Sequence, residues 1–205
     1  MARPDKHALQ TRGITLLAPQ HSAVRRLRRE HGSPSLHGTK VWESSYVVMN
    51  HLLRQRPPRG ARFMDLGCGW GPLSIFAAKR LGQQVTSVDA DAGVFPFLNL
   101  HAELNGVSVT PLQRRFERLR VADMQGIHTL VGTDICFWES LTPVLLNLVR
   151  RARKAGVAKI IIADPGRPPF YELVERCQAE FPVRITHGRT QDPLPAWAQL
   201  MVIED

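Results

Sequence analysis

A glycine-rich loop between an apolar run and an amphipathic segment constrains the fold of this chain most. The apolar run from Ala61 gives way to Gly67, Gly69 and Gly71, and apolar residues resume at helical spacing over residues 73–81. The order strand, glycine loop, helix predicts the first unit of a doubly wound α/β sheet. Glycine allows positive φ and lets a ligand lie against the main chain, so the loop is predicted to hold a nucleotide-like ligand.

The spacing of the glycines indicates which kind of nucleotide-like ligand the loop binds. A dinucleotide fingerprint reads G-x-G-x-x-G and faces a pyrophosphate with a helix N-terminus. Here the spacing is G-x-G-x-G, Pro72 follows, and Asp65 stands at the end of the strand. An acid at that point repels a diphosphate and attracts an amino group. A second acid, Asp89, closes the next apolar run at the distance where a carboxylate can accept both ribose hydroxyls.

These two motifs resemble those of the class I, seven-strand S-adenosylmethionine methyltransferases. The resemblance implies an α/β fold with a doubly wound, Rossmann-like seven-stranded sheet in the order 3-2-1-4-5-7-6, strand 7 antiparallel, and helices on both faces. It implies S-adenosyl-L-methionine as cofactor, with binding roles for the acids and glycines at the first two strand ends: Asp65, Gly67, Gly69, Gly71 and Asp89. After the third strand many relatives carry an acid that contacts adenine. This chain has Phe116 in that region, predicted to stack on adenine.

The segment before the first strand carries a further resemblance. Val41, Ser45, Val48 and Leu52 form a helical stripe, which predicts a helix lying on the sheet. A glycine, a short gap, Val-Trp-acid and an apolar helix resemble the segment before motif one in the protein-methyltransferase group called family 16. That group contains lysine methyltransferases and bacterial nicotinamide N-methylase-like relatives. The resemblance places Trp42 beside the cofactor, and the alternative for Trp42 is an aromatic anchor in the core.

The fourth predicted strand ends in an acid and two aromatic residues, Asp134, Phe137 and Trp138. Ligands bind at the carboxyl ends of strands near the switch point of a doubly wound sheet, so Asp134 is predicted to face both cofactor and methyl acceptor. The family-16 signature here is acid, two residues, tyrosine, and this chain lacks the hydroxyl. We predict a catalytic site in which Asp134 orients an amine and Phe137 and Trp138 form its walls. Core packing is the alternative for the two aromatic residues.

The fifth predicted strand, residues 158–163, runs into Asp164-Pro165-Gly166-Arg167. This turn resembles the Asp-Pro-Gly-Arg loop of bacterial members of the same group. Arg167 is predicted either to bind an acidic substrate or to pair with a carboxylate. A helix over 171–181 and two last strands, at 183–186 and 198–203, complete the predicted sheet.

Composition limits the class of protein. At 205 residues, 43% of them hydrophobic, the chain is predicted to form one domain, with an arm and helix over 1–36 before a methyltransferase domain over 37–205. No apolar run approaches the roughly 20 residues of a membrane helix, and the N-terminus lacks the apolar core of a signal peptide, so we expect a cytoplasmic protein. The three cysteines form no C-x-x-C motif, so neither a disulfide framework, a zinc site nor any other metal is predicted.

The formal charge of +9 invites a nucleic-acid interpretation. Much of the excess lies in two clusters, residues 25–29 and 150–154, near the ends of predicted helices, where cations complement the helix dipole. An acidic protein or RNA partner is the alternative. The chain also lacks the Asn/Asp-Pro-Pro-aromatic motif of methyltransferases that act on bases or glutamine amides. Its absence disfavours a nucleic-acid substrate without excluding one.

The sequence therefore predicts S-adenosylmethionine-dependent N-methylation, with a lysine of a protein as the favoured acceptor. Methylation of a small-molecule amine or of RNA remains open, and so does a cofactor-binding module without catalysis. Nothing in the sequence marks an interface or defines an oligomeric state.

Overall fold

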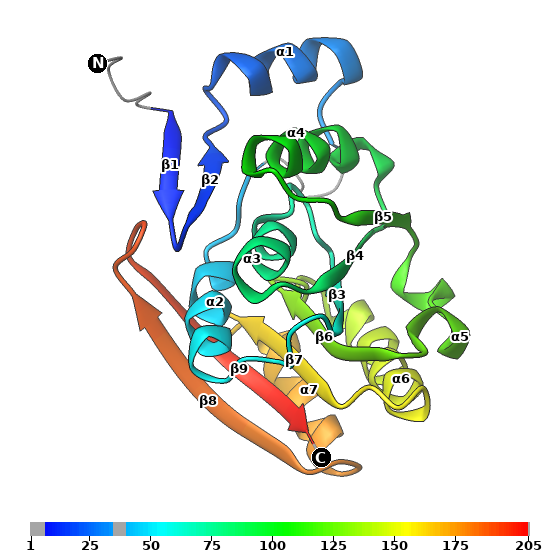
Figure 1. Ribbon diagram of the computed structural model, residues 1–205. Coiled ribbons are helices and arrows are strands. Elements are labelled where there is room, and N and C mark those ends of the chain that lie inside the picture. The colour runs from blue at the N-terminus through cyan, green and yellow to red at the C-terminus, as the bar shows by residue number, and fades with distance from the viewer. Residues whose placement is uncertain (1–6, 35–39, 205) are drawn as a thin grey trace.

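The computed structural model describes residues 7–34 and 40–204, so Gly38 of the family-16 pattern lies outside the described residues. Its centre is one seven-stranded sheet in the order β5-β4-β3-β6-β7-β9-β8 (Figure 1). The strands are β3 (Arg62–Leu66), β4 (Gln84–Asp89), β5 (Thr110–Gln113), β6 (Ile127–Thr133), β7 (Lys159–Asp164), β8 (Val183–Thr190) and β9 (Ala196–Glu204). Only β9 runs antiparallel to both of its neighbours. The predicted strand order and the antiparallel last strand are confirmed.

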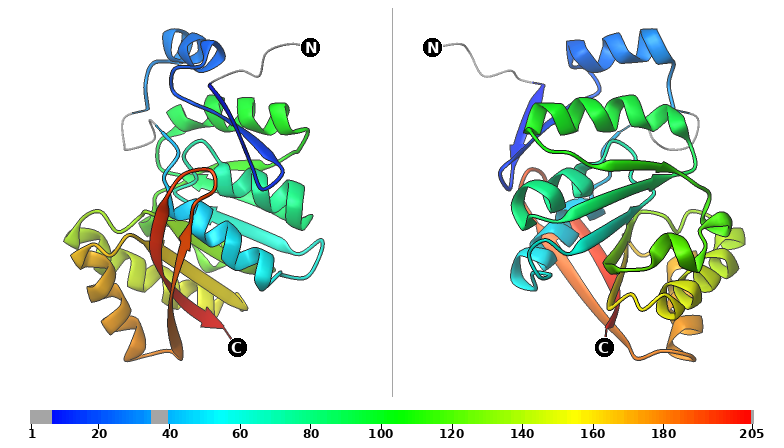
Figure 2. Two further views of the ribbon diagram at one scale, coloured as in Figure 1. Left: turned by 90° about the vertical axis from the view of Figure 1, so that its left-hand side faces the viewer. Right: turned by 45° about the vertical axis from the view of Figure 1, so that its right-hand side comes forward.

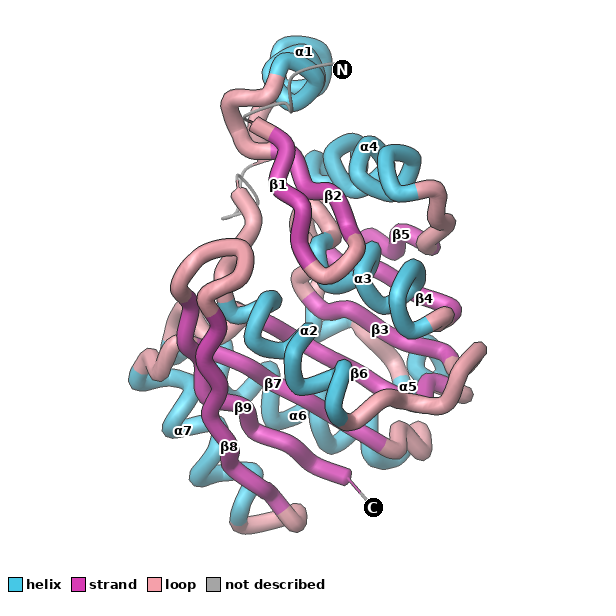
Figure 3. The backbone as a smooth tube through the Cα atoms, turned by 60° about the vertical axis from the view of Figure 1, so that its left-hand side comes forward, coloured by secondary structure: helices cyan, strands magenta, loops and turns pink. Residues whose placement is uncertain are grey.

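Helices cover both faces of this sheet (Figure 3). On one face lie α2 (Ser44–Arg54), α3 (Pro72–Leu81) and α4 (Phe95–Asn105), and on the other lie α5 (Val121–Met124), α6 (Thr142–Lys154) and α7 (Pro168–Gln178). Three short 3₁₀ segments, η1 (Ala92–Val94), η2 (Phe116–Arg118) and η3 (Glu139–Leu141), lie between them. Each face buries its own apolar cluster, as expected for a sheet with helices on both sides.

The turn from β3 into α3 is fixed by its sequence. Pro72 occupies the first turn of α3, where its missing N–H has no intrahelical partner to lose. Gly71, which precedes it, has φ of +77°, and a Cβ there would lie 2.1 Å from Leu98 Cδ1 in α4. Glycine at this position therefore permits both the left-handed turn and the close packing of α3 against α4.

The N-terminal segment packs against the same face. β1 (Ala8–Thr11) and β2 (Ile14–Leu17) form an antiparallel hairpin, and α1 (Ser22–His31) lies beyond α4 (Figure 2). Ile14 and Leu16 are buried in the same apolar cluster as α2 and α3. The boundary predicted between 1–36 and 37–205 thus separates segments that share a core, and it stays a prediction.

The last helix differs from its predicted bounds. The periodicity predicted a helix over 171–181, whereas α7 begins at Pro168 and ends at Gln178. Pro168 and Pro169 start the helix because proline is compatible with the first turn, so the preceding loop is shorter than expected. Cations do occupy the last turns of α1 and α6, as predicted. The three cysteines are buried and unpaired. Within residues 7–34 and 40–204, no helix combines the length and apolar character needed to cross a bilayer.

Candidate active site

A pocket with an empty volume of about 650 Å³, its open mouth included, lies where β3, β4 and β6 end. Its lining comes from the loops after these strands, from η2 and η3, and from the segment before α2: Trp42, Gly67, Gly69, Asp89, Ala90, Phe116, Thr133, Asp134, Ile135, Phe137, Trp138 and Leu141. Most of the predicted site residues therefore meet in one place, although they come from segments far apart in the chain. Asp65 and Gly71 are not part of the lining.

The cofactor side of the pocket, which we define as Gly67, Gly69, Asp89 and Phe116, is built on the glycine loop. Gly69 has φ of +52°, and a Cβ placed there would meet nothing within 4 Å, so its backbone is open to a ligand. The Asp89 carboxylate accepts hydrogen bonds from Gly69 N and Asp91 N, both at 3.0 Å. Burial raises the pKa of Asp89. These two bonds fix the carboxylate at the pocket wall.

Further contacts fix the chain around the cofactor side. Asp91 accepts from Gly93 N at 2.8 Å and so caps the start of η1. The Phe116 ring lies near Gly67, since a Cβ added to Gly67 would be 3.7 Å from Phe116 Cζ. Arg114 N, two residues earlier, donates to the Asp89 carbonyl at 2.8 Å. The chain after β5 is thereby tied to the end of β4.

Asp65 lies beneath the glycine loop. It is 2% exposed, and its carboxylate accepts from Ser74 Oγ at 2.6 Å, while Ser74 Oγ in turn accepts from Ser87 Oγ at 2.7 Å. Burial raises the pKa of Asp65 to about 7. Its visible contacts hold the first turn of α3, and its predicted role toward an amino group of the cofactor stays a prediction.

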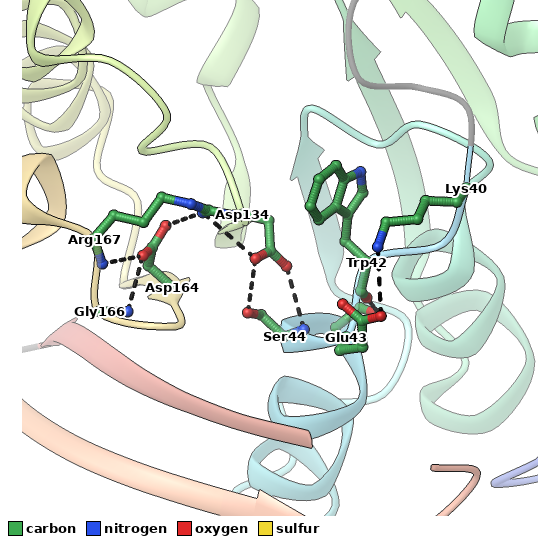
Figure 4. A network of polar contacts seen from close by, with 9 residues as sticks. Lys40, Trp42, Glu43, Ser44, Asp134, Asp164, Gly166 and Arg167 are labelled. Carbon is green, nitrogen blue, oxygen red and sulfur yellow. Dashed lines mark hydrogen bonds and ion pairs between the residues drawn. The ribbon is translucent and has the colours of Figure 1, made fainter. Parts of the chain in front are cut away.

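The acceptor side of the pocket, which we define as Asp134, Phe137, Trp138 and Trp42, begins at the end of β6. Asp134 has φ of +55°, and its N–H donates to the Ala163 carbonyl at 2.9 Å. Its carboxylate accepts from Ser44 Oγ at 3.0 Å and from Ser44 N at 3.2 Å, at the start of α2 (Figure 4). The backbone bond and these two contacts hold the side chain in a single orientation. Ser44 was not predicted as a site residue, because its only signal in the sequence is its place near the start of a predicted helix.

Arg167 joins this carboxylate to a second one. Its Nη1 lies 2.6 Å from Asp164 Oδ2 and 3.6 Å from Asp134 Oδ1 (Figure 4). Asp164 also accepts from Gly166 N and Arg167 N. Of the two roles predicted for Arg167, pairing with a carboxylate is the one seen here. Two buried carboxylates share this guanidinium, and burial raises the pKa of Asp134 to about 6 even though Ser44 and Arg167 lower it.

Aromatic rings complete the acceptor side. Trp42 and Phe137 meet edge to face at 5.2 Å between centroids, and Phe137 lies 5.7 Å from Trp138. The Arg167 guanidinium stacks on Phe137 at 4.3 Å, and Lys40 Nζ lies over Trp42 at 4.4 Å. Trp138 is 49% exposed, so core packing does not account for it. The arrangement places one buried carboxylate in the same pocket as three aromatic rings, of which Trp138 is the most exposed.

The pocket fits the cofactor implied by the glycine loop. The Phe116 ring offers a flat apolar surface for a base, the anchored Asp89 carboxylate can accept ribose hydroxyls, and the exposed Gly69 backbone leaves room for the methionine part. Together, this sheet order and this pocket define a class I S-adenosylmethionine-dependent methyltransferase domain, and the chain contains one.

Comparison with known proteins gives the same class. A protein-family profile described as "Methyltransferase domain" matches residues 63–156. The electron transfer flavoprotein beta subunit lysine methyltransferase of Xenopus laevis is 31% identical over 63% of this chain and 52% of its own length. A ubiquinone biosynthesis O-methyltransferase of Ruegeria pomeroyi is 39% identical over 35% of this chain and 28% of its own length. The chain thus spans about half the first relative and less of the second.

A solved structure agrees with the fold. The magnesium protoporphyrin IX methyltransferase of Synechocystis, solved with bound S-adenosylmethionine, aligns with a TM-score of 0.59 at 14% identity, over 90% of this chain and 92% of its own. At that identity the likeness concerns the fold alone. The relatives named here differ in the acceptor that their names give, so they leave the acceptor of this chain to be argued from its pocket.

Proposed function

We propose that this chain transfers a methyl group from S-adenosylmethionine to the side-chain amine of a lysine in a protein. The observation that carries the proposal is the buried Asp134 carboxylate, held by Ser44 and Arg167 in a pocket that also contains the rings of Phe137 and Trp42, Asp89 and the glycine loop. A carboxylate in a pocket with aromatic rings is suited to an amine, because it accepts N–H hydrogen bonds while the rings attract a cation. The Xenopus relative, a lysine methyltransferase by name, supports the choice of acceptor.

Each residue has a chemical role in this proposal. When bound, S-adenosylmethionine would supply a methyl group on a sulfonium sulfur: the amine nitrogen bonds to the methyl carbon while the carbon–sulfur bond breaks, and S-adenosylhomocysteine leaves. Asp89 would accept hydrogen bonds from the ribose hydroxyls, Phe116 would stack on the adenine, and the backbone of Gly67 and Gly69 would leave room for the methionine part. Asp134 accepts a hydrogen bond from the amine and so points the lone pair of the amine nitrogen at the methyl carbon. Positioning of this kind is the main demand of the reaction, because the methyl group is already activated.

The acceptor must be a neutral amine when it reacts. Burial in an apolar site disfavours the charged form of lysine and lowers its pKa. Phe137, Trp138 and Trp42 provide that apolar surrounding, and the proton leaves to water through the open mouth beside Trp138. Asp134 offsets part of the cost of desolvation, since it attracts the ammonium before the proton is lost.

Labelling of a host lysate tests the proposal. The purified protein is incubated with lysate and S-adenosylmethionine carrying a radioactive methyl group, and the products are split into nuclease-treated and protease-treated halves. We expect discrete protein bands that survive nuclease and that yield methyllysine on hydrolysis. Label lost with nuclease would replace the proposal by RNA methylation. Label in neither polymer would leave a small amine, or cofactor binding without catalysis, as the function.

A further inference from the structure

The described chain exposes six large hydrophobic side chains to 36% or more: Leu104, Trp138, Tyr171, Ile185, Leu194 and Trp197. The three aromatic ones, Trp138, Tyr171 and Trp197, come from segments at the carboxyl ends of β6 and β7 and at the start of β9. We call these three residues the aromatic rim. Exposed aromatic side chains are enriched at protein interfaces, where tryptophan and tyrosine contribute a large share of the binding energy.

Contacts connect the aromatic rim to the acceptor side of the pocket. A Cβ added to Gly166 would lie 2.9 Å from Tyr171 Oη and 3.5 Å from the Trp197 ring, so these two side chains flank the Gly166 backbone. The next residue, Arg167, stacks on Phe137, which in turn contacts Trp138. Neighbouring side chains therefore connect Tyr171 and Trp197 to Trp138, which lines the pocket.

The segment that carries Trp197 is braced from behind. The turn between β8 and β9 lies beside the β1–β2 hairpin (Figure 3), where Arg12 Nη2 donates to Thr190 Oγ1 at 2.6 Å and Thr11 Oγ1 donates to Asp192 at 3.0 Å. Arg12 Nε also donates to Asn50 in α2 at 2.7 Å. A surface held in this way loses little conformational entropy when a partner binds.

The charges around the mouth indicate what the partner carries. Inside, Asp134 and Asp164 face the single guanidinium of Arg167, which suits a cation. Outside, a second hollow shares Ala90 with the pocket and is lined by Arg114, Arg115 and Arg118 together with Gln113, Glu117 and Arg120. Within residues 7–34 and 40–204, Arg114, Arg115 and Arg118 form no ion pair. An acid inside the pocket, with unpaired arginines in the hollow next to it, complements a lysine that has acidic residues nearby.

We propose that the aromatic rim docks a segment of the protein substrate in which the acceptor lysine is flanked by acidic residues. The inference rests on the proposed function and names its substrate class. Tyr171 and Trp197 supply the apolar contact area, and the arginines of the second hollow bind carboxylates of the segment. A segment of this kind also suits the chain's net charge of +9.

Peptide binding without turnover tests the inference. The probe is a fluorescein-labelled peptide with a central lysine next to a leucine and two glutamates on each side, and its anisotropy is measured with the protein saturated in S-adenosylhomocysteine. Analogues carry alanines or lysines in place of the glutamates. We expect the acidic peptide to bind at least tenfold more tightly than the basic one, with an advantage that shrinks as salt is added.

Substitutions of exposed side chains test whether the peptide binds at the aromatic rim. Tyr171→Ala and Trp197→Ala should each weaken binding of the acidic peptide about tenfold. Leu104→Ala and Ile185→Ala remove comparably exposed side chains elsewhere and should leave it unchanged. The pair Arg115→Gln and Arg118→Gln should weaken binding, whereas Arg25→Gln and Arg29→Gln, an equal change of charge in α1, should not.

The outcomes separate this inference from the proposed function. Equal affinity for the acidic and basic peptides, no binding of any peptide, or unchanged binding by the rim variants would overturn the docking surface. Weaker binding of Leu104→Ala to the same degree would do so as well. Lysate labelling reports on lysine methylation independently, because protein bands that survive nuclease can appear whether or not the rim selects acidic segments.

Discussion

The cofactor side and the acceptor side of the pocket are built by different means. On the cofactor side, backbone geometry dominates: Gly69 leaves the main chain open, and backbone N–H groups hold the Asp89 carboxylate. On the acceptor side, side chains hold one another, because Asp134 depends on Ser44 from α2 and on Arg167 from the loop after β7. The first arrangement is local in sequence, whereas the second joins residues about 120 positions apart.

This difference predicts which property a substitution on each side of the pocket changes. A change in the glycine loop acts on the backbone, so it alters the fold together with cofactor binding. A change among Asp134, Ser44 and Arg167 alters charge and orientation while the sheet stays in place. Substitutions should therefore separate stability and cofactor affinity on one side from turnover on the other.

The largest expected effect is on stability. Gly71→Ala forces an alanine into positive φ and places its Cβ 2.1 Å from Leu98 Cδ1. We expect it to lower the free energy of unfolding by about 2–5 kcal/mol, the sum of a left-handed residue and an overpacked core. Urea denaturation measures this loss. Gly106→Ala is the matched control: φ there is +64°, but a Cβ meets nothing within 4 Å, so only about 1–2 kcal/mol should be lost. Equal losses would contradict the packing role of Gly71.

Asp134→Asn should have the next largest effect, on turnover alone. The amide keeps the shape of the side chain but loses the negative charge that orients the amine, so we expect kcat to fall about a hundredfold. Ser44→Ala removes the hydroxyl bond to Asp134 and leaves the backbone bond, so it should reduce kcat by a smaller factor, about tenfold. Steady-state methylation assays on the labelled substrate measure both. A Ser44→Ala defect as large as that of Asp134→Asn would mean that Ser44 does more than orient the carboxylate.

A smaller effect is expected on the pH profile. Burial raises the pKa of Asp134 to about 6, while Ser44 and Arg167 lower it and Asp164 adds to the rise, so turnover should increase as the pH climbs through about 6. Arg167→Met removes a lowering charge and should move this acid limb to higher pH, whereas Arg167→Lys should restore it in part. An acid limb that does not move in Arg167→Met would contradict the electrostatic role of Arg167.

The raised pKa of Asp134 also determines how its contribution to stability depends on pH. Because the pKa of Asp134 in the folded protein lies above its ordinary value near 3.8, folding favours the protonated form. Its contribution to stability is complete below about pH 4 and is lost as the pH rises through about 6. Arg167→Met should deepen this loss, which urea denaturation at pH 4 and pH 8 would measure.

Much of the fold was predictable because its signals are local. The alternation of apolar runs with helical stripes predicted the α/β class, the resemblance to class I methyltransferases implied the sheet order, and the acid-glycine loop predicted the position of the pocket. The start of α7 was predicted three residues late, since Pro168 and Pro169 were taken for loop although proline is tolerated in a first helical turn.

The acceptor side was only partly predictable. Asp134, Phe137 and Trp138 follow a recognisable strand, but Ser44 and the bridge from Arg167 to two carboxylates depend on how distant segments pack. A serine at the first position of a helix is too common a feature to be singled out in a sequence. The bond from Ser74 to Asp65 likewise depends on packing that the motif does not specify, and the predicted contact of Asp65 with the cofactor stays a prediction.

The central claim is that binding of the cofactor and presentation of the amine belong to separate sides of one pocket. Isothermal titration of S-adenosylhomocysteine into the wild type, Asp89→Ala and Asp134→Asn tests it most directly. We predict that Asp89→Ala loses about a hundredfold or more in affinity, because two charge-assisted hydrogen bonds to the ribose disappear, while Asp134→Asn binds within about threefold of the wild type. Equal losses in the two variants, or wild-type affinity in Asp89→Ala, would contradict this division.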